Sequence, residues 1–357
     1  MSKLNIQASA PGKLILLGEY AVLEQAPCLV VAVNRSCNVN LEPIDGDVFS
    51  IEASNQEIPK VQFTLNEGHI QFSEPLSDVN RDRLRFVLYT LNYVIEQNNN
   101  TLPTAVIKID SESFYHKKSG NKLGLGASAA ITVSLLSALT KLINKPLTGQ
   151  ELYRTAHKIH RKAQGKIGSG ADIAASSVGG ILQYRMAENG ALDGYLDPVV
   201  WPKGLIMIPI WAGYSASTQD MVRKVKTYRD ENPASFNAIM DPLKQLSKNG
   251  CHAFQNGDTE KFLQIVDDFI EQEKKLGEAS DTEIISEAHL QILKAVKSAG
   301  GVYKPSGAGS GDIGVAFCNN LNTAQKIKQA VESKGFDKLD LSLQITETNT
   351  LEQHTVA

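Results

Sequence analysis

The segment Gly124–Leu142, GLGASAAITVSLLSALTKL, decides how the rest of the sequence is interpreted. Two glycines and several small residues precede a long apolar stretch, so the segment predicts a glycine turn that opens a helix. Small side chains let the backbone approach an anion, and the free amides of a helix N-terminus attract it. The loop is a candidate cradle for a phosphate chain, although a glycine before a helix is often only a turn. It is no Walker loop, since no GK[ST] follows, and Lys122 just before it could add a charge.

Upstream, the segment APGKLILLGEYAVLEQAP at 10–27 holds a single cation, Lys13, among small and apolar residues. Such a lysine either extends to solvent along its aliphatic stem or neutralises charge that develops on a transferred phosphoryl group. The segment alone favours the first interpretation.

Downstream, HRKAQGKIGSGADIAASSVGG at 160–180 places Asp172 after a glycine loop, in the first turn of a small-residue segment. This aspartate could cap the helix, or it could hold a substrate group by accepting or orienting its proton. On the preceding helix, His157, His160, Arg161 and Gln164 share one face. That face is either a ligand-facing edge or a solvated polar face, and we predict no zinc there because no third ligand is near.

The last glycine-rich segment is KPSGAGSGDIGVAF, at 304–317. A loop this dense in glycine can close over a substrate with its amides, and the carboxylate of Asp312 would complete the pocket. A simple surface loop is the alternative for any one of its residues.

Length and composition predict two domains, because 357 residues with 42% hydrophobic content exceed one ordinary core. We place the division at 1–198 and 199–357. A net charge of −3 gives no reason to expect a nucleic acid or a membrane as partner. The four cysteines show no CxxC spacing, and the N-terminus lacks a secretory core, so we expect a cytoplasmic protein, monomer or homodimer.

Hydrophobic patterning predicts both strands and helices. Short β-rich runs between residues 5 and 72 suggest an antiparallel meander, and a helix follows at 81–97. Further strands are expected at 104–109, 181–185, 205–212, 313–317 and 339–344. Further helices are expected after Gly126, at 149–164, in several segments between 217 and 299, and at 323–335.

In this order, APGKxxLxGEYAV, GLGxSAA and SGAGSGD resemble the three motifs of the GHMP kinase superfamily, and they span nearly the whole chain. Four segments look more specifically like those of the phosphomevalonate kinases: GEYAVLE, HRKAQGKIGSGAD, WAGYSAST and KPSGAGSGD. Mevalonate kinases more typically have a histidine after GE and a GxPSGxD segment. The resemblance implies an N-terminal ribosomal-protein-like α+β domain and a C-terminal ferredoxin-like domain, with the active site between them.

The resemblance also assigns residues. Lys13 and Asp172 would be the catalytic pair. The ATP phosphate site would comprise Lys122, Gly124, Leu125, Gly126, Ala127, Ser128 and Ala129, with Ser128 at the magnesium-associated position. The acceptor side would comprise Tyr20, His160, Gln164, Ser169, Ser217, Ala308 and Gly309. Two positions depart from the superfamily: Ala127 replaces the first of two serines, and Arg161 falls near the magnesium-binding glutamate of mevalonate kinases.

The implied reaction uses ATP and Mg²⁺ to convert 5-phosphomevalonate, a small-molecule substrate, into 5-diphosphomevalonate. The nearest alternative is a GHMP kinase that acts on mevalonate or a sugar. A diphosphomevalonate decarboxylase and a non-catalytic binding relative are more distant alternatives, and intact Lys13 and Asp172 argue against the latter.

Overall fold

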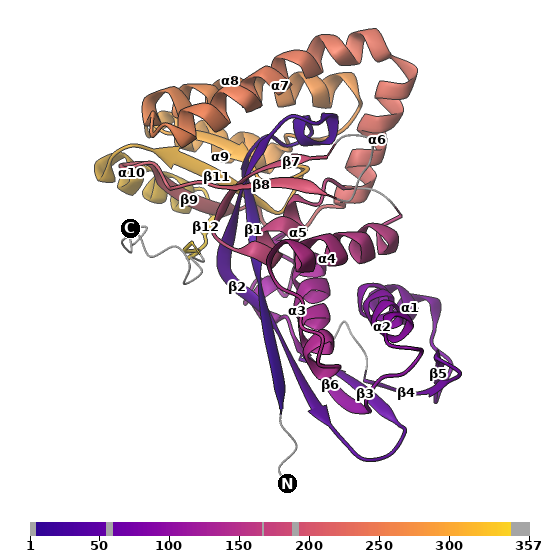
Figure 1. The fold of residues 1–357 in the computed structure, drawn as a ribbon. Coiled ribbons are helices and arrows are strands. Elements are labelled where there is room, and N and C mark those ends of the chain that lie inside the picture. The colour runs from indigo at the N-terminus through magenta and orange to yellow at the C-terminus, as the bar shows by residue number, and fades with distance from the viewer. Residues whose placement is uncertain (1–4, 55–59, 166–167, 188–192, 344–357) are drawn as a thin grey trace.

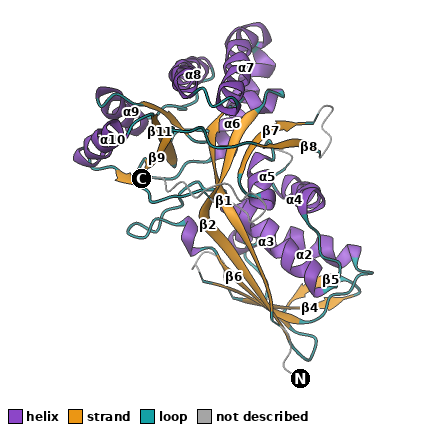
Figure 2. Cartoon of the chain, turned by 60° about the vertical axis from the view of Figure 1, so that its left-hand side comes forward, coloured by secondary structure: helices purple, strands orange, loops and turns teal. Residues whose placement is uncertain are grey.

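The computed structural model describes residues 5–54, 60–165, 168–187 and 193–343, which form two β-sheets with helices packed on them (Figures 1 and 2). The strands are β1 (Ile6–Leu17), β2 (Cys28–Pro43), β3 (Phe49–Ala53), β4 (Val61–Asn66), β5 (His69–Phe72), β6 (Ala105–Asp110), β7 (Ile181–Met186), β8 (Gly194–Pro198), β9 (Ile206–Trp211), β10 (Val302–Pro305), β11 (Ile313–Cys318) and β12 (Asp337–Lys338). The α-helices are α1 (Asp78–Arg83), α2 (Arg85–Gln97), α3 (Ala127–Leu142), α4 (Gly149–Ala163), α5 (Ala171–Val178), α6 (Thr218–Glu231), α7 (Pro233–Gln255), α8 (Thr259–Ala279), α9 (Glu287–Ser298) and α10 (Leu321–Ser333). Two 3-10 helices, η1 (Ala21–Glu24) and η2 (Glu112–Phe114), complete the described elements.

The first sheet contains β1 to β8, and its middle is the long antiparallel hairpin of β1 and β2 (Figure 1). Along the sheet the order is β5-β4-β3-β6-β2-β7-β8, with β1 paired to β2. Helices α2 to α5 pack together on one face of this sheet, where α3 and α5 contact β1 and β2 (Figure 2). Helix α3 is buried on nearly all sides because it lies between the sheet and the neighbouring helices, which explains its uniformly apolar sequence.

The second sheet has the order β10-β11-β9-β12, and its described pairs are antiparallel. Helices α7 and α8 pack side by side, α8 and α9 contact β10, and α10 contacts β9, β11 and β12. Helix α7 also contacts η1, β1 and β2, so it joins the second part of the chain to the first. The predicted division between residues 198 and 199 falls in the connection between β8 and β9.

Most predicted elements are present, and three predictions were wrong in detail. The first strands do not form one meander, because β3 pairs in parallel with β6 rather than with β2. The helix predicted at 81–97 is split at Leu84 into α1 and α2. The strand predicted at 339–344 is replaced by the two-residue β12 and an isolated bridge from Leu343 to Val33; residue 344 lies outside the described residues. Two short strands, β8 and β10, were not predicted.

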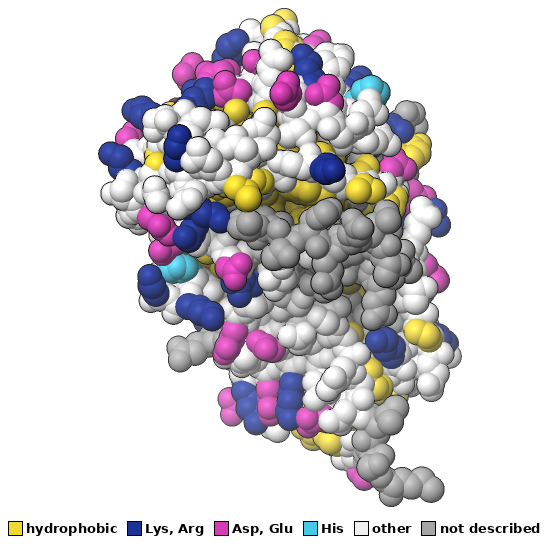
Figure 3. Space-filling view, turned by 90° about the vertical axis from the view of Figure 1, so that its left-hand side faces the viewer, with side chains coloured by type: hydrophobic (Ala, Val, Ile, Leu, Met, Phe, Trp, Pro, Cys, Tyr) yellow, Lys and Arg dark blue, Asp and Glu magenta, His cyan; other side chains and the backbone are white. Residues whose placement is uncertain are grey.

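The four cysteines are free and buried. Burial raises the pKa of Cys37 and of Cys251 to about 12, and it raises the pKa of the Cys28 thiol well above its ordinary value. No helix within the described ranges combines the length and the apolar character that a membrane span requires. On the described part of the face in Figure 3, basic and acidic side chains are interspersed, and neither sign covers a large area.

Candidate active site

The glycine-rich segments converge on one cavity of 360 Å³, to which widely separated parts of the chain contribute. The predicted residues that line it are Lys13, Tyr20, Lys122, Gly124, Leu125, Gly126, Ala127, Ser128, Gln164, Ser169, Asp172 and Ala308. A more open depression of 710 Å³ lies over β1, β2 and β6, but none of the glycine-rich loops reaches it. The smaller cavity is therefore the candidate site.

The loop before α3 is held against β1 by the backbone of the first motif. The Lys13 amide donates to the Leu125 carbonyl at 2.9 Å, and Lys13 Nζ donates to the Gly124 carbonyl at 3.2 Å. Gly124 and Gly126 have φ of +73° and +79°, a region that favours glycine. Gly126 is also the N-cap residue of α3 and offers no side-chain cap, so the first amides of the helix can bind an anion.

Lys13 and Asp172 both approach Gly126 on the side where a Cβ atom would stand. A Cβ atom built on Gly126 would be 3.3 Å from Lys13 Cγ and 3.7 Å from Asp172 Cβ. Lys13 is 9% exposed, so its charge acts in a site largely shielded from water. Gly170 is the N-cap of α5, and Asp172, two positions further on, accepts from the adjacent Ile173 amide at 2.9 Å. The cap interpretation of Asp172 is therefore wrong, and its carboxylate is available to the cavity.

Asp312 brings a second carboxyl group to the glycine loop before α3. It follows the third glycine-rich segment with φ of +60°, and its Oδ2 would lie 2.6 Å from a Cβ atom on Gly124. Burial raises the pKa of Asp312 to about 6, while the Lys13 charge and a hydrogen bond from the Ala216 amide act in the opposite direction. Asp312 therefore changes its charge close to neutral pH, and it does so beside the loop expected to bind phosphates.

Four of the residues predicted for the site lie outside the cavity lining: Ala129, His160, Ser217 and Gly309. Ala129 is buried one position deeper in α3. Ser217 is the N-cap of α6 and accepts from the Asp220 amide. Gly309 is packed against the Ile284 carbonyl, where no side chain would fit.

His160 does not line the cavity, but it contacts Ser128, which does. Its Nε2 lies 3.1 Å from Ser128 Oγ, and its ring stacks on Phe86 at a centroid distance of 4.8 Å. Burial lowers the pKa of His160, so the neutral imidazole is favoured beside Ser128. His157 contacts Tyr153 instead, so the two histidines of the polar helix face have separate partners.

The oxygen atoms around the loop fit a hard divalent cation. Ser128, Asp172 and Asp312 supply hydroxyl and carboxylate oxygens to the cavity lining, and Mg²⁺ is commonly held by one or two carboxylates together with substrate phosphates. Within the described ranges, no three His, Cys, Asp or Glu side chains form a metal cage of their own. A cation at this site would therefore depend on a phosphate-bearing ligand.

Glu19 and Lys304 are among the residues of this region that the sequence did not single out. Glu19 lines the cavity and pairs with Lys304, which lies 285 positions away. Glu19 lies in GEYAVLE and Lys304 in KPSGAGSGD, so the sequence identified the two segments but not these two side chains. The pairing had no local signal because it depends on the tertiary fold.

Comparison with known proteins agrees with this arrangement. The model of the GHMP kinases N terminal domain matches residues 85–180, and that of the GHMP kinases C terminal matches residues 251–338. The phosphomevalonate kinase of Streptomyces sp. (strain CL190) is 26% identical over 335 residues, which cover 86% of this chain and 88% of that protein. The mevalonate kinase of Thermococcus gammatolerans is 28% identical over 240 residues, 66% of each chain.

Among solved structures, that of Streptococcus pneumoniae phosphomevalonate kinase in complex with phosphomevalonate and AMPPNP gives a TM-score of 0.74 at 19% identity, covering 95% of this chain and 100% of that chain. The two-domain α+β fold predicted from the sequence is thereby confirmed. With both family models matched, one in each half, this chain belongs to the GHMP kinase family.

Proposed function

We propose that this GHMP kinase transfers the γ-phosphoryl group of ATP to 5-phosphomevalonate. Members of the family are ATP-dependent phosphotransferases. The observation that carries the proposal is the convergence of Lys13, Asp172 and the uncapped start of α3 on one cavity. The phosphomevalonate kinase relative supports the choice of acceptor, because it is similar over most of both chains.

In the proposed reaction, a phosphate oxygen of the acceptor attacks the γ-phosphorus, and the bond to the β-phosphate oxygen breaks to release ADP. Lys13 stabilises the charge on the transferring group, and the amides at the start of α3 bind the nucleotide phosphates. A divalent cation held by Ser128, Asp172 and Asp312 would neutralise further phosphate charge. Such catalysis consists mainly of positioning and electrostatic stabilisation.

Asp172 has a different task with a phosphate acceptor than with an alcohol. A phosphate monoester has its second pKa near 6, so the attacking oxygen is already ionised at neutral pH. Asp172 then needs to orient Lys13 and the acceptor rather than remove a proton. With mevalonate the attacking hydroxyl would have to lose its proton, and Asp172 would be the base.

A second cavity supports an acidic acceptor over a neutral sugar. It has a volume of 500 Å³ and shares four lining residues with the first: Tyr20, Leu23, Gly168 and Val222. Its described lining contains the basic residues Arg161, Arg223, Lys226 and Arg229 and the acidic residue Glu24. Arg229 pairs with Glu24 at 2.9 Å and Arg223 with Asp220 at 3.0 Å, and Lys226 adds a further positive charge to the lining. The carboxylate end of 5-phosphomevalonate would fit there, while its phosphate faces Lys13.

The test is ADP release by the purified protein with Mg²⁺ and ATP, with 5-phosphomevalonate, mevalonate or galactose as acceptor. We expect release only with 5-phosphomevalonate, and a diphosphate product by mass spectrometry. The Asp172→Asn variant shows how much ADP release depends on this site. The matched control is Asp197→Asn, which makes the same substitution at an exposed position. Release with mevalonate would contradict the proposed acceptor, and equal turnover by the two variants would remove Asp172 from the site.

A further inference from the structure

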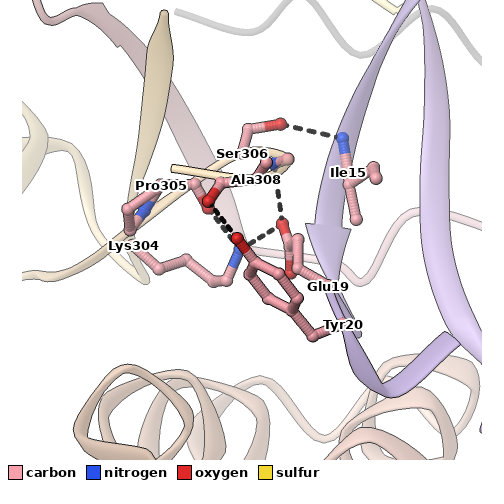
Figure 4. A network of polar contacts seen from close by, with 8 residues as sticks. Ile15, Glu19, Tyr20, Lys304, Pro305, Ser306 and Ala308 are labelled. Atoms are coloured by element: carbon pink, nitrogen blue, oxygen red, sulfur yellow. Dashed lines mark hydrogen bonds and ion pairs between the residues drawn. The ribbon is translucent and has the colours of Figure 1, made fainter. Parts of the chain in front are cut away.

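A buried charge cluster joins the first and third motifs beside the candidate site (Figure 4). Lys304 of β10 donates to Oε1 of Glu19, which follows β1, and their side chains are 0% and 1% exposed. Lys304 also donates to the Pro305 carbonyl and lies 5.8 Å from the centre of the Phe269 ring. Because the surroundings exclude water, neither charge has solvent as an alternative partner.

The same side chains hold the loop that lines the cavity. Besides Lys304, Glu19 Oε1 accepts from the Gly307 amide at 3.3 Å. The neighbouring Tyr20 hydroxyl donates to the Ala308 carbonyl at 2.5 Å. Gly307 and Ala308 belong to the lining, and Gly307 has φ of +105° with open space around it. Glu19 and Tyr20 therefore hold the backbone of this loop at Gly307 and Ala308, next to the bond that Ser306 Oγ accepts from the Ile15 amide.

Glu273 of α8 is the third ionisable member of the cluster. It is completely buried, and among the described residues neither of its carboxyl oxygens has a hydrogen-bond partner. Burial raises the pKa of Glu273, Lys304 lowers it, and the negative charge of Glu19 raises it further. Lys304 donates to Glu19, and no described group donates to Glu273, so burial favours the neutral form of Glu273.

We propose that Lys304 and Glu19 are positioning residues for the acceptor, because their ion pair holds the Gly307–Ala308 backbone against the cavity. Glu273 takes no part in holding this loop. The identity of the acceptor rests on the proposed function, whereas the fixing of the loop does not. Lys304 does not line the cavity itself, so it acts through Glu19 and through its own bond to the Pro305 carbonyl. A structural role in joining the two parts of the chain would instead affect both substrates alike.

The two carboxyl groups provide a matched pair of variants. Glu19→Gln removes the charge that orders Gly307, and Glu273 can then ionise to balance Lys304, so the variant remains able to fold. Glu273→Gln replaces a neutral acid with a neutral amide of the same shape. We expect Glu19→Gln to raise the KM for 5-phosphomevalonate roughly tenfold, the scale of one lost charge-assisted hydrogen bond, with the KM for ATP unchanged. Glu273→Gln should leave both KM values as in the wild type.

Tyr20→Phe removes the hydrogen bond to the Ala308 carbonyl and leaves the ion pair in place. Like Glu19→Gln, it should raise the KM for the acceptor. Lys304→Arg keeps the positive charge, so it should retain more of the wild-type affinity for the acceptor than Lys304→Met does. Equal effects of Glu19→Gln and Glu273→Gln, or equal rises in the KM for ATP and for the acceptor, would overturn the proposal in favour of a structural role.

Hydrogen exchange separates this inference from the assignment of the acceptor, because it needs no turnover. In the free protein, peptides that contain Gly307 and Ala308 should exchange faster in Glu19→Gln than in Glu273→Gln. If no acceptor supports ADP release but this difference is present, the proposed function fails and the positioning role stands. If the two variants exchange alike at this loop, the positioning role fails whichever acceptor is used.

Discussion

Asp312 is the carboxyl group of the cavity whose pKa is most clearly displaced, and this displacement has a measurable effect on stability. Its pKa in the folded protein is about 6, against an ordinary value of 3.8. At pH values below the ordinary pKa the group is protonated in both the folded and the unfolded chain. As the pH rises, the unfolded chain loses this proton first, so the folded state loses stability until the pH passes 6.

We therefore expect Asp312→Asn to stabilise the ligand-free protein more at pH 7.5 than at pH 4.5, by on the order of 2 kcal/mol. The free energy of unfolding of both proteins, measured in urea at the two pH values, gives this difference. Asp197→Asn, at an exposed position, should show no such change. A constant difference between Asp312→Asn and the wild type across this range would contradict the assigned pKa shift.

At the residue scale, the sequence identified which segments meet but not every atom that faces the cavity. Lys13, Asp172 and the loop Gly124–Ser128 could be predicted because their motifs are continuous in the chain. The contact between His160 and Ser128 could not be predicted, since helical spacing gives a shared face but not what that face contacts.

Two glycines before α3 allow the effect of a positive φ to be separated from the effect of a steric clash. Gly120 and Gly124 have nearly the same φ, +72° and +73°. A Cβ atom on Gly120 would meet nothing within 4 Å, whereas one on Gly124 would collide with the Asp312 carboxyl group. An alanine at either position would be strained by the positive φ, but only an alanine at position 124 would also clash with Asp312.

We expect Gly124→Ala to raise the KM for ATP by roughly tenfold or more, because the phosphate loop must move away from Asp312. Gly120→Ala should lose about 1 kcal/mol of stability and keep the wild-type KM for ATP. Steady-state kinetics with varied ATP, together with thermal unfolding, measure both quantities. If the two variants had the same KM, the close approach of Asp312 to the loop would not matter for nucleotide binding.

At the scale of elements, the sequence predicts segments with a clear pattern and misses partners that depend on the whole sheet. The helix after Gly126 and the strand at 104–109 were confirmed because their apolar patterns are long enough to be distinctive. The parallel pairing of β3 with β6 was not predicted, since pairing follows from tertiary packing rather than from either strand alone. The run LDLSLQ alternates like a strand, but of its described residues Leu339 bonds to Pro209 of β9 and Leu343 bridges to Val33 of β2, so the run is divided between two strands.

The molecule as a whole is united by a shared hydrophobic core. One buried cluster includes Leu17 of β1, Val31 of β2, Phe254 of α7, Phe262 of α8 and Phe317 of β11. These residues come from both sheets and from the helices between them, so separating the two domains would expose apolar surface that neither could cover alone.

We expect the ligand-free protein to unfold in a single cooperative transition rather than domain by domain. Differential scanning calorimetry should give one peak with an enthalpy of about 250 kcal/mol near 60 °C, equal to the van't Hoff enthalpy. Two resolved peaks, or a van't Hoff enthalpy near half of the calorimetric value, would show that the shared core does not couple the domains.

The buried thiols described above bear on how the protein withstands oxidants. Oxidation by peroxide begins at an exposed thiolate, and burial raises the pKa of all four cysteines. Cys28 lies in β2 and Cys251 in α7, the two elements that contact each other where the halves of the chain meet. Peroxide can reach those two sulfur atoms only after the protein has opened there, so the folded enzyme should tolerate oxidative stress for as long as its shared core stays closed.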